Sequence, residues 1–151
     1  MKVSEAMTRD VRIANPGETI RQAARTMAEI DAGVLPVQEN DRLVGMITDR
    51  DIAVRAVAAG KAPDTPIRDV MSSDLCYCFD DQEIADVAAN MADIKVRRLP
   101  VVDREKRLVG ILSLGDIAQA DDQERPAVEA LCGVTEPGGQ HTQSGEGQLP
   151  A

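Results

Sequence analysis

The sequence predicts a mixed α/β protein made of two tandem repeats, each with its elements in the order β-α-β-β-α. Residues 7–37 align with residues 71–101 without a gap, and residues 42–53 align with residues 107–118 after one extra residue near Glu105–Lys106. Within each repeat, a segment with apolar residues at helical spacing is followed by short apolar runs typical of strands. Each repeat then closes on the same motif: a glycine in an apolar run, a hydroxyl residue, and an aspartate three residues later.

The identities between the repeats are spread along the whole alignment. In the first block the identical pairs are Met7/Met71, Asp10/Asp74, Ile20/Ile84, Ala24/Ala88, Met27/Met91, Ala28/Ala92, Ile30/Ile94, Leu35/Leu99, Pro36/Pro100 and Val37/Val101. In the closing block they are Arg42/Arg107, Leu43/Leu108, Val44/Val109, Gly45/Gly110, Asp51/Asp116, Ile52/Ile117 and Ala53/Ala118. Two copies are too few for a solenoid, so we expect the two units to pack through their sheets as a pseudo-twofold pair.

The first half of the N-terminal repeat contains a helical turn, a short strand and a helix. Apolar spacing predicts a turn of helix over Val3–Met7, and alternation predicts a strand over Val11–Ile13. Thr19 stands where a helix cap belongs, and Ile20–Ile30 carries one apolar stripe. Gly33 is expected to end that helix, because glycine readily takes the left-handed conformation of a helix C-terminus.

The second half contains a hairpin and a second helix. Val34–Val37 is predicted to be a strand, and its proline indicates an edge or bulge position. Asn40–Asp41 forms a tight turn into a strand over Leu43–Ile47. A helix is expected from about Arg50 to Ala59, with Gly60 at its end.

The C-terminal repeat is predicted to use the same elements. After a helical turn at Ile67–Met71 they are a strand near Leu75–Phe79, a helix near Glu83–Lys95, strands over Arg98–Val102 and Leu108–Leu112, and a helix from about Gly115. This places repeat 1 at residues 1–60, a linker at 61–66 and repeat 2 at 67–121. A further helix is expected over 122–132. The glycine-rich segment 133–151 is expected to be disordered, because it has too little apolar area to offset the entropy of ordering its backbone.

Composition excludes several classes of protein. The 151 residues are 43% hydrophobic and 28% charged but only 1% aromatic, so the core must be aliphatic. A net charge of −9 argues against nucleic acid as the main partner, because phosphate binding needs a basic face. No apolar run approaches the roughly 20 residues of a membrane helix, and the N-terminus lacks a signal-peptide pattern. Together with three cysteines and no evident disulfide framework, this predicts a cytoplasmic protein without a membrane partner.

The repeated unit and its closing motif resemble the cystathionine-β-synthase (CBS) domain pair, also called a Bateman module. The resemblance covers about residues 2–121 and rests on the β-α-β-β-α order and on the closing motif in both copies. Because no catalytic or transport domain is evident, the chain is most similar to stand-alone CBS pairs, including the small bacterial stress- and hypoxia-response type. The Thr48–Asp51 sequence, Thr-Asp-Arg-Asp, and Ala58–Gly60 support that closer likeness.

The resemblance implies an adenosine-containing regulatory ligand in clefts between the two units, either AMP, ADP or ATP or S-adenosylmethionine. If the motif residues have the same roles here as in that family, Asp51 and Asp116 would accept hydrogen bonds from ribose hydroxyls, and Thr48 and Ser113 would donate to a phosphate. Residues that would flank the base in the first site are Val11, Arg12, Ile13, Gly33, Val34, Leu35 and Pro36. Those in the second are Leu75, Cys76, Tyr77, Arg97, Arg98, Leu99 and Pro100. The resemblance implies no required cofactor and a homodimer that regulates a protein partner.

The two copies differ in ways that bear on these sites. Ser113 keeps the hydroxyl of Thr48, but Leu114–Gly115 replaces Asp49–Arg50 and removes two polar groups. Arg97–Arg98 has no basic counterpart in the first copy and could reach a phosphate or simply be solvated. The hydroxyl and carboxyl residues could also serve only as helix caps.

Other functions stay open. The chain could be an interaction module with empty clefts, or less plausibly a metal or redox sensor using Cys76, Cys78 and Cys132. The cysteine spacing is not that of a zinc finger, and the single histidine, His141, lies in the expected tail. We identify no catalytic constellation and no metal site, so the sequence predicts a protein that is not an enzyme.

Overall fold

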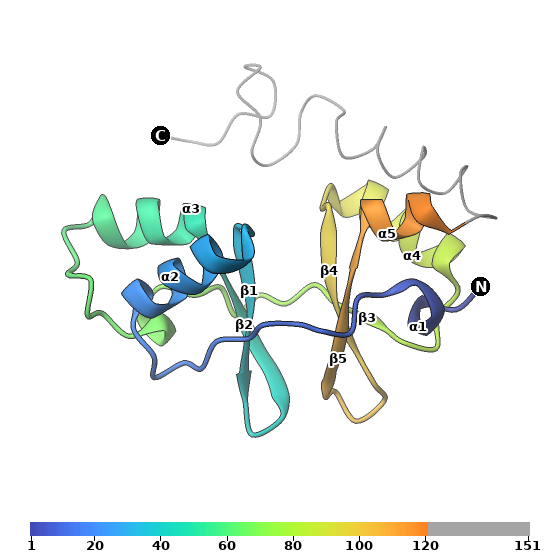
Figure 1. The fold of residues 1–151 in the computed structure, drawn as a ribbon, viewed down its shortest axis with the longest axis horizontal. Helices are drawn as coiled ribbons and strands as arrows, with labels where there is room; N and C mark the ends of the chain where they lie inside the picture. The colour runs from blue at the N-terminus through green and yellow to red at the C-terminus, as the bar shows by residue number, and fades with distance from the viewer. Residues whose placement is uncertain (121–151) are drawn as a thin grey trace, which may run out of the picture. The chain divides into compact units, whose positions relative to one another are not determined.

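The computed structural model describes residues 1–120, which form two compact units (Figure 1). The N-repeat unit consists of residues 10–76 and 104–108. The C-repeat unit consists of residues 1–9, 77–103 and 109–120. The mixed α/β class is confirmed. The helix expected over 122–132 and the disorder expected over 133–151 lie outside the described residues.

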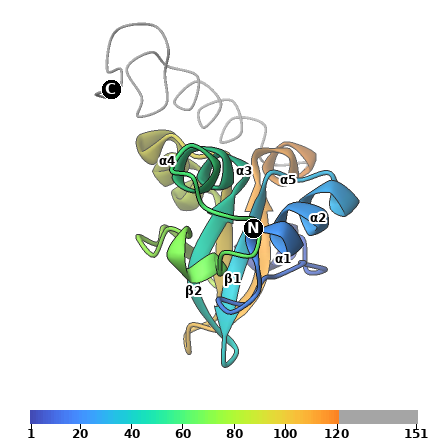
Figure 2. The same cartoon turned by 90° about the vertical axis from the view of Figure 1, so that its left-hand side faces the viewer.

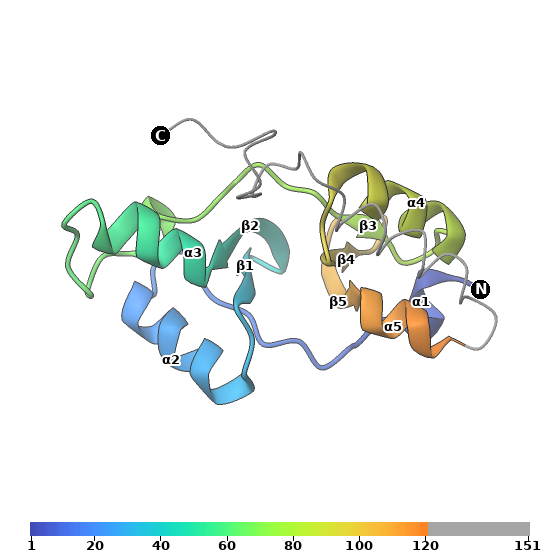
Figure 3. The same ribbon diagram turned by 90° about the horizontal axis from the view of Figure 1, so that it is seen from above.

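The N-repeat unit is a β-hairpin covered by helices on one face (Figures 1 and 3). Its elements are α2 (Ile20–Ile30), β1 (Val34–Glu39), β2 (Arg42–Thr48), α3 (Asp49–Asp51), a π-helical turn that continues α3 (Ile52–Val57) and a 3₁₀ turn (Ile67–Asp69). The two strands pair antiparallel. Figure 2, seen from the helical side of this unit, shows α2 and α3 in front of the hairpin.

The C-repeat unit repeats this arrangement with a three-stranded sheet. Its elements are α1 (Val3–Ala6), β3 (Cys78–Phe79), α4 (Ile84–Ile94), β4 (Arg98–Val102), β5 (Leu108–Ser113) and α5 (Leu114–Gln119). The sheet order is β3-β4-β5, and β3 runs parallel to β4 with Cys78 opposite Val101. The matching pair in the N-repeat unit is a single parallel bridge between Ala14 and Val37.

Each unit has its own aliphatic core, as the near absence of aromatic residues predicts. In the N-repeat unit the buried residues are Ala14, Ile20, Ala23, Met27, Leu35, Val37, Ile47, Ala56, Ile67 and Val70. In the C-repeat unit they are Val3, Met7, Cys78, Ile84, Val87, Ala88, Met91, Leu99, Val101, Leu112 and Ile117. Four of the identical pairs are buried in both cores: Ile20/Ile84, Met27/Met91, Leu35/Leu99 and Val37/Val101.

The leading segment of each repeat, residues 3–8 in repeat 1 and 67–72 in repeat 2, begins with a turn that packs on the core of the other repeat. Val3, at the start of the chain, is fully buried in the C-repeat core, and its N–H donates to Gln82 O at 2.9 Å. Ile67 is likewise fully buried in the N-repeat core, and its N–H donates to Glu18 O at 2.8 Å. Because of this exchange, neither unit is made from one continuous stretch of sequence.

The exchange explains why the closing motif contains a glycine. A Cβ on Gly45, in β2, would lie 2.8 Å from Ser72 O and 2.9 Å from Met71 Sδ. A Cβ on Gly110 would lie 2.7 Å from Met7 Sδ and 2.8 Å from the carbonyl oxygen of Thr8. Each leading segment therefore crosses the partner repeat's strand too closely for any side chain at this position.

The structure confirms several local predictions. Thr19 caps α2 in a reciprocal capping box with Gln22. Asn40 and Asp41 take positive φ values of 53° and 62°, as a tight hairpin turn requires. The strand register shifts immediately after Pro36–Val37, which confirms the bulge that the proline indicated.

Other local predictions were wrong. Val11–Ile13 is not a strand, because backbone pairing begins only at Ala14, whose N–H donates to Pro36 O. The predicted strand at Leu75–Phe79 shrinks to Cys78–Phe79. The helix predicted from about Arg50 to Ala59 is present and starts at Asp49, but it is π-helical over Ile52–Val57, which the sequence did not predict.

Gly33 does not end α2. Asp31 does so instead, with a left-handed φ of 54°, and Lys95 takes the same role after α4 with a φ of 58°. Aspartate tolerates this conformation better than most residues. The glycine two residues later serves a different purpose, which concerns the candidate site.

Candidate functional site

The hydroxyl and the carboxylate of the closing motif meet at the start of α3. Thr48 Oγ1 accepts a hydrogen bond from Asp51 N at 2.9 Å, and Asp51 Oδ2 accepts one from Thr48 N at 3.0 Å. Two donors that a helix start would otherwise leave without partners are thereby satisfied. The helix-cap role considered from the sequence is therefore real, and it holds the Asp51 side chain in a fixed place.

The same geometry occurs at the start of α5. Ser113 Oγ accepts from Asp116 N at 3.1 Å, and Asp116 Oδ2 accepts from Ser113 N at 3.0 Å. Serine preserves the cap because only its hydroxyl oxygen takes part. Each unit therefore carries one half-buried carboxylate, fixed at the junction of a strand and a helix.

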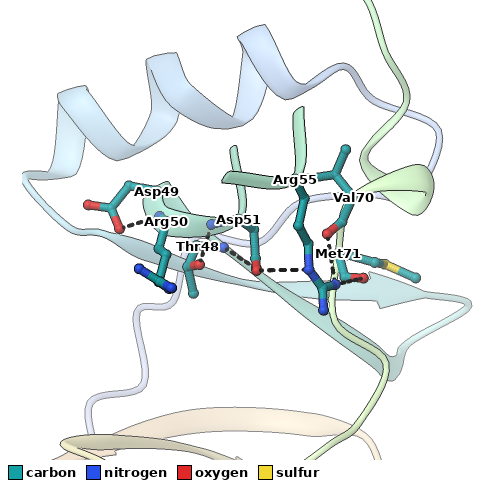
Figure 4. A network of polar contacts seen from close by, with 7 residues as sticks. All are labelled: Thr48, Asp49, Arg50, Asp51, Arg55, Val70 and Met71. Carbon is teal, nitrogen blue, oxygen red and sulfur yellow. Dashed lines mark hydrogen bonds and ion pairs between the residues drawn. The ribbon is translucent and has the colours of Figure 1, made fainter. Parts of the chain in front are cut away.

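The two carboxylates differ in what contacts their remaining oxygen. Asp51 Oδ1 lies 3.8 Å from the guanidinium Nε of Arg55, one helical turn later. Arg55 Nη1 in turn donates to the carbonyl oxygens of Val70 and Met71, each at 3.3 Å (Figure 4). Arg55 thus joins the carboxylate to the leading segment of the other repeat.

Asp116 has a neutral neighbour instead. Thr8 Oγ1 lies 3.3 Å from Asp116 Oδ1 and 3.5 Å from its Oδ2, and donates to the carboxylate. The sequence interpretation included neither Thr8 nor Arg55. Arg55 could have been found from its position four residues after Asp51 on a helix. Thr8 could not, because its contact depends on the exchange of leading turns.

Two backbone segments flank the starts of these helices in the same way. Asp49 N donates to Gly33 O at 2.9 Å, and Leu114 N donates to Arg97 O at 3.1 Å. Val34 is paired with Thr48 across the hairpin. The structure therefore brings Gly33 and Val34 to the closing motif of the N-repeat unit.

The other predicted residues of the N-repeat site occupy varied positions. Leu35 and Pro36 are buried, and Leu35 belongs to the core, so only their backbone is available. Ile13 is exposed beside Ala14, which is bonded to β1. Arg12 is exposed and pairs with Glu29 on α2 at 3.2 Å.

The predicted residues of the C-repeat site divide similarly. Leu99 and Pro100 are buried, whereas Arg97 and Arg98 are exposed. Cys76 is exposed, and Tyr77 is half-buried with its ring edge-on to Phe79 at 5.7 Å between centroids.

The two cysteines within residues 1–120 lie in different environments, Cys76 exposed and Cys78 buried. Burial raises the pKa of the Cys78 thiol to about 12, which leaves it protonated and unreactive near neutral pH. Among residues 1–120, no three His, Cys, Asp or Glu side chains gather in a way that could hold a metal. Cys132 and His141 lie outside the described residues.

Comparison with protein families gives a direct match. A model of the CBS domain matches this chain twice, over residues 3–57 and 67–122. The CBS domain-containing protein YhcV of Bacillus subtilis is 39% identical over 133 residues, covering 88% of this chain and 94% of its own. Hypoxic response protein 1 of Mycobacterium tuberculosis is 39% identical over 117 residues, covering 76% of this chain and 81% of its own.

Solved structures show the same fold. The crystal structure of Hypoxic Response Protein I, which holds two coordinated zinc ions, has a TM-score of 0.72 and 35% identity, covering 80% of this chain and 98% of that one. The CBS domain pair of MJ0100, in complex with 5′-methylthioadenosine and S-adenosylmethionine, has a TM-score of 0.68 and 28% identity, covering 79% and 98%. Separately, none of the helices within residues 1–120 is long and apolar enough to cross a membrane.

Proposed function

The chain belongs to the CBS-domain family, with two CBS repeats, and we propose that it is a regulatory module that binds an adenosine-containing ligand. The candidate ligands are AMP, ADP, ATP and S-adenosylmethionine. The complex of MJ0100 with two adenosine-containing molecules supports this class of ligand. The proposed role is regulatory rather than catalytic, with the ligand changing the affinity of the chain for a partner protein.

The observation that carries the proposal is the fixed carboxylate in each repeat. The cap uses Asp51 Oδ2, while Oδ1 lies 3.8 Å from Arg55, beyond hydrogen-bond length. A carboxylate offers about four lone-pair positions, so Oδ1 can accept from the vicinal hydroxyls of a ribose. A hydrogen bond to a charged group contributes about 1.5–3 kcal/mol. Asp116 offers the same group, with Thr8 as an additional donor to it.

The neighbouring residues complete the proposed sites. Thr48 and Ser113 accept their cap bonds through oxygen, so each hydroxyl proton can be donated to the ligand. In the N-repeat unit Val34 and Ile13 would contact the base. In the C-repeat unit Tyr77 would do so, with the exposed guanidinium groups of Arg97 and Arg98 available to an anionic group.

Arg55 offers a route from ligand binding to a change elsewhere. A ribose hydroxyl on Asp51 Oδ1 would compete with Arg55 for the carboxylate, and Arg55 also holds the carbonyls of Val70 and Met71. Binding at Asp51 would therefore shift the position of the leading segment of repeat 2. Coupling free energies of this kind are typically about 1–3 kcal/mol.

Thermal unfolding with AMP, ADP, ATP and S-adenosylmethionine tests the proposal. The variants Asp51→Asn and Asp116→Asn keep one oxygen for the cap but replace the other by a donor. A ligand at 100 times its dissociation constant should stabilise the wild type by about 2.7 kcal/mol, which raises Tm by several degrees. At least one variant should lose that rise, whereas Asp64→Asn, which removes an equal exposed charge, should keep it. A rise that survives in both site variants and in their double variant would exclude these sites.

A second candidate function is protein interaction through exposed apolar residues. Val54 and Val57, on the turn after α3, are 49% and 68% exposed, and Ile94 at the end of α4 is 38% exposed. We propose that such helix faces pair two chains into a homodimer. Light scattering would then give twice the 16.2 kDa mass of one chain. A mass equal to one chain would contradict the dimer without affecting the ligand proposal.

A further inference from the structure

The two candidate sites differ in charge at the residue that follows the hydroxyl residue of the closing motif. In the N-repeat unit this residue is Asp49, and its backbone N–H donates to Gly33 O. In the C-repeat unit the corresponding residue is Leu114, which donates to Arg97 O. The same pair of positions therefore holds glycine and an acid in one unit, and arginine and leucine in the other.

Gly33 and Asp49 fit each other closely. A Cβ on Gly33 would lie 2.8 Å from Asp49 Oδ2 and 3.2 Å from both Cγ and Oδ1. The carboxylate thus lies directly against the backbone of residue 33, in space that a side chain there would fill. This contact accounts for Gly33, which has no role in ending α2, and it holds the acid beside the candidate site.

The Asp49 carboxylate also accepts a hydrogen bond from a backbone N–H that a bound phosphate could otherwise use. Its Oδ1 accepts from Arg50 N at 2.8 Å. The neighbouring N–H groups of Asp49 and Asp51 donate to Gly33 O and Thr48 Oγ1, both at 2.9 Å. All three backbone donors at the start of this helix are therefore directed to acceptors within the protein. Figure 4 shows two of these bonds, those donated by Arg50 N and Asp51 N.

The C-repeat unit lacks this feature. Leu114 has no side-chain oxygen, so it cannot form the equivalent bond to the N–H of Gly115. The adjacent guanidinium groups of Arg97 and Arg98 are exposed. A negative group beside residue 49 would meet the fixed Asp49 carboxylate, whereas one beside residue 114 would meet no acid at that position and the exposed guanidinium groups of Arg97 and Arg98.

We infer that Asp49 determines ligand specificity: the N-repeat site takes an adenosine ligand without a phosphate, and phosphorylated adenosines prefer the C-repeat site. The inference rests on the proposed function, since it presupposes an adenosine ligand on Asp51. Asp49 and Arg50 are both exposed, but the Asp49 carboxylate is held against Gly33 and accepts the Arg50 N–H, which fixes its charge in place. The nearby guanidinium of Arg55 is paired with Asp51. A neutral or positively charged 5′ substituent, as in a thioether or sulfonium, meets no such repulsion.

Calorimetric titration of the full chain with AMP and with 5′-methylthioadenosine tests the inference. An Asp116→Asn background isolates the N-repeat site. In that background 5′-methylthioadenosine should bind more tightly than AMP. Adding Asp49→Asn keeps the side-chain oxygen but removes the charge, and should strengthen AMP binding by about fivefold or more, since fivefold corresponds to the repulsion between two unit charges about 4 Å apart in water. Binding of 5′-methylthioadenosine should change less than about twofold.

Matched controls separate the effect of a charge at this position from the effect of side-chain shape and from that of the protein's net charge. Asp64→Asn removes one exposed acid of the same unit and should leave the affinity ratio of the two ligands unchanged. In an Asp51→Asn background, Leu114→Asp should weaken AMP binding relative to Leu114→Asn. Both lose the packing of Leu114 on the core, but only the aspartate adds charge.

Each outcome decides the question. An AMP to 5′-methylthioadenosine affinity ratio that Asp49→Asn leaves unchanged would overturn the inference, whether both affinities stay the same or both rise by the same factor. In either case the proposed function would stand, because adenosine binding would have been observed. If the folded wild-type chain binds neither ligand, the inference fails. If it also fails to bind ADP, ATP and S-adenosylmethionine, the proposed function fails with it.

Discussion

The close approach at Gly45 allows a quantitative test of the exchanged leading turns. Alanine at this position would place its Cβ 2.8 Å from Ser72 O and 2.9 Å from Met71 Sδ. The methionine side chain can move, but Ser72 O belongs to a backbone bridge in which Met46 and Ser72 each donate to the other at 2.9 Å. The strain must therefore fall on the strand or on the leading segment.

Overpacking of this kind typically costs about 1–3 kcal/mol. A loss of 2 kcal/mol corresponds to a fall in Tm of roughly 4–8 °C for a chain of this size. Gly45→Ala should therefore unfold several degrees below the wild type in a calorimetric scan. Met71→Ala loses packing of its own, so the effect of Gly45→Ala is compared within a Met71→Ala background. There Gly45→Ala should cost less than in the wild type but still lower Tm, because the carbonyl contact remains.

Gly115→Ala is the matched control. Its Cβ would meet only Ser113 Oγ at 3.6 Å, an ordinary contact, and alanine is favoured over glycine in a helix by about 1 kcal/mol. This variant should be as stable as the wild type or slightly more so. If Gly45→Ala matches the wild type in Tm, the leading segment does not cross the strand as described and the reasoning is refuted.

Three further predictions concern single side chains. Thr48→Ala should lose about 1 kcal/mol of unfolding free energy in urea titrations while Thr48→Ser loses little, because the cap needs only a hydroxyl; equal losses would contradict the cap. Arg55→Ala should speed amide hydrogen exchange in residues 67–72, with under about 1 kcal/mol lost globally because Arg55 is largely exposed, and unchanged exchange would exclude the proposed link. The raised pKa of Cys78 means that its contribution to stability is complete below pH 9 and is lost as the pH rises toward 12. Cys78→Ala should flatten the fall in Tm over that range, and an unchanged slope would contradict the assignment.

Most elements of the fold could be predicted from the sequence, because the duplication shows the pattern of each element twice. Helices α2 and α4 and the hairpin of the N-repeat unit follow from apolar spacing and from the Asn40–Asp41 turn. The edge strands could not be predicted reliably. Before α2, backbone pairing with β1 is confined to Ala14, because the other neighbour of β1 is β2. No local pattern distinguishes one bonded residue from three alternating ones.

The closing motif was also readable from the sequence, but its surroundings were not. Thr48 and Asp51 stand together because their spacing forms a capping box. The neighbours that distinguish the two carboxylates arrive through tertiary contacts: Thr8 through the exchanged turn, and Gly33 through its contact with Asp49. The sequence predicts Gly33 at the end of α2, because a glycine needed for close approach looks the same in sequence as a glycine needed for a left-handed turn.

Titration of the wild-type chain with 5′-methylthioadenosine in a calorimeter tests the central claim most directly, because this ligand presents the ribose and base without a phosphate. Saturable heat that disappears in the Asp51→Asn/Asp116→Asn double variant, and persists in Asp64→Asn, is the result expected. A folded wild-type chain that gives no saturable heat with this ligand, nor with S-adenosylmethionine, AMP, ADP or ATP, would contradict the account.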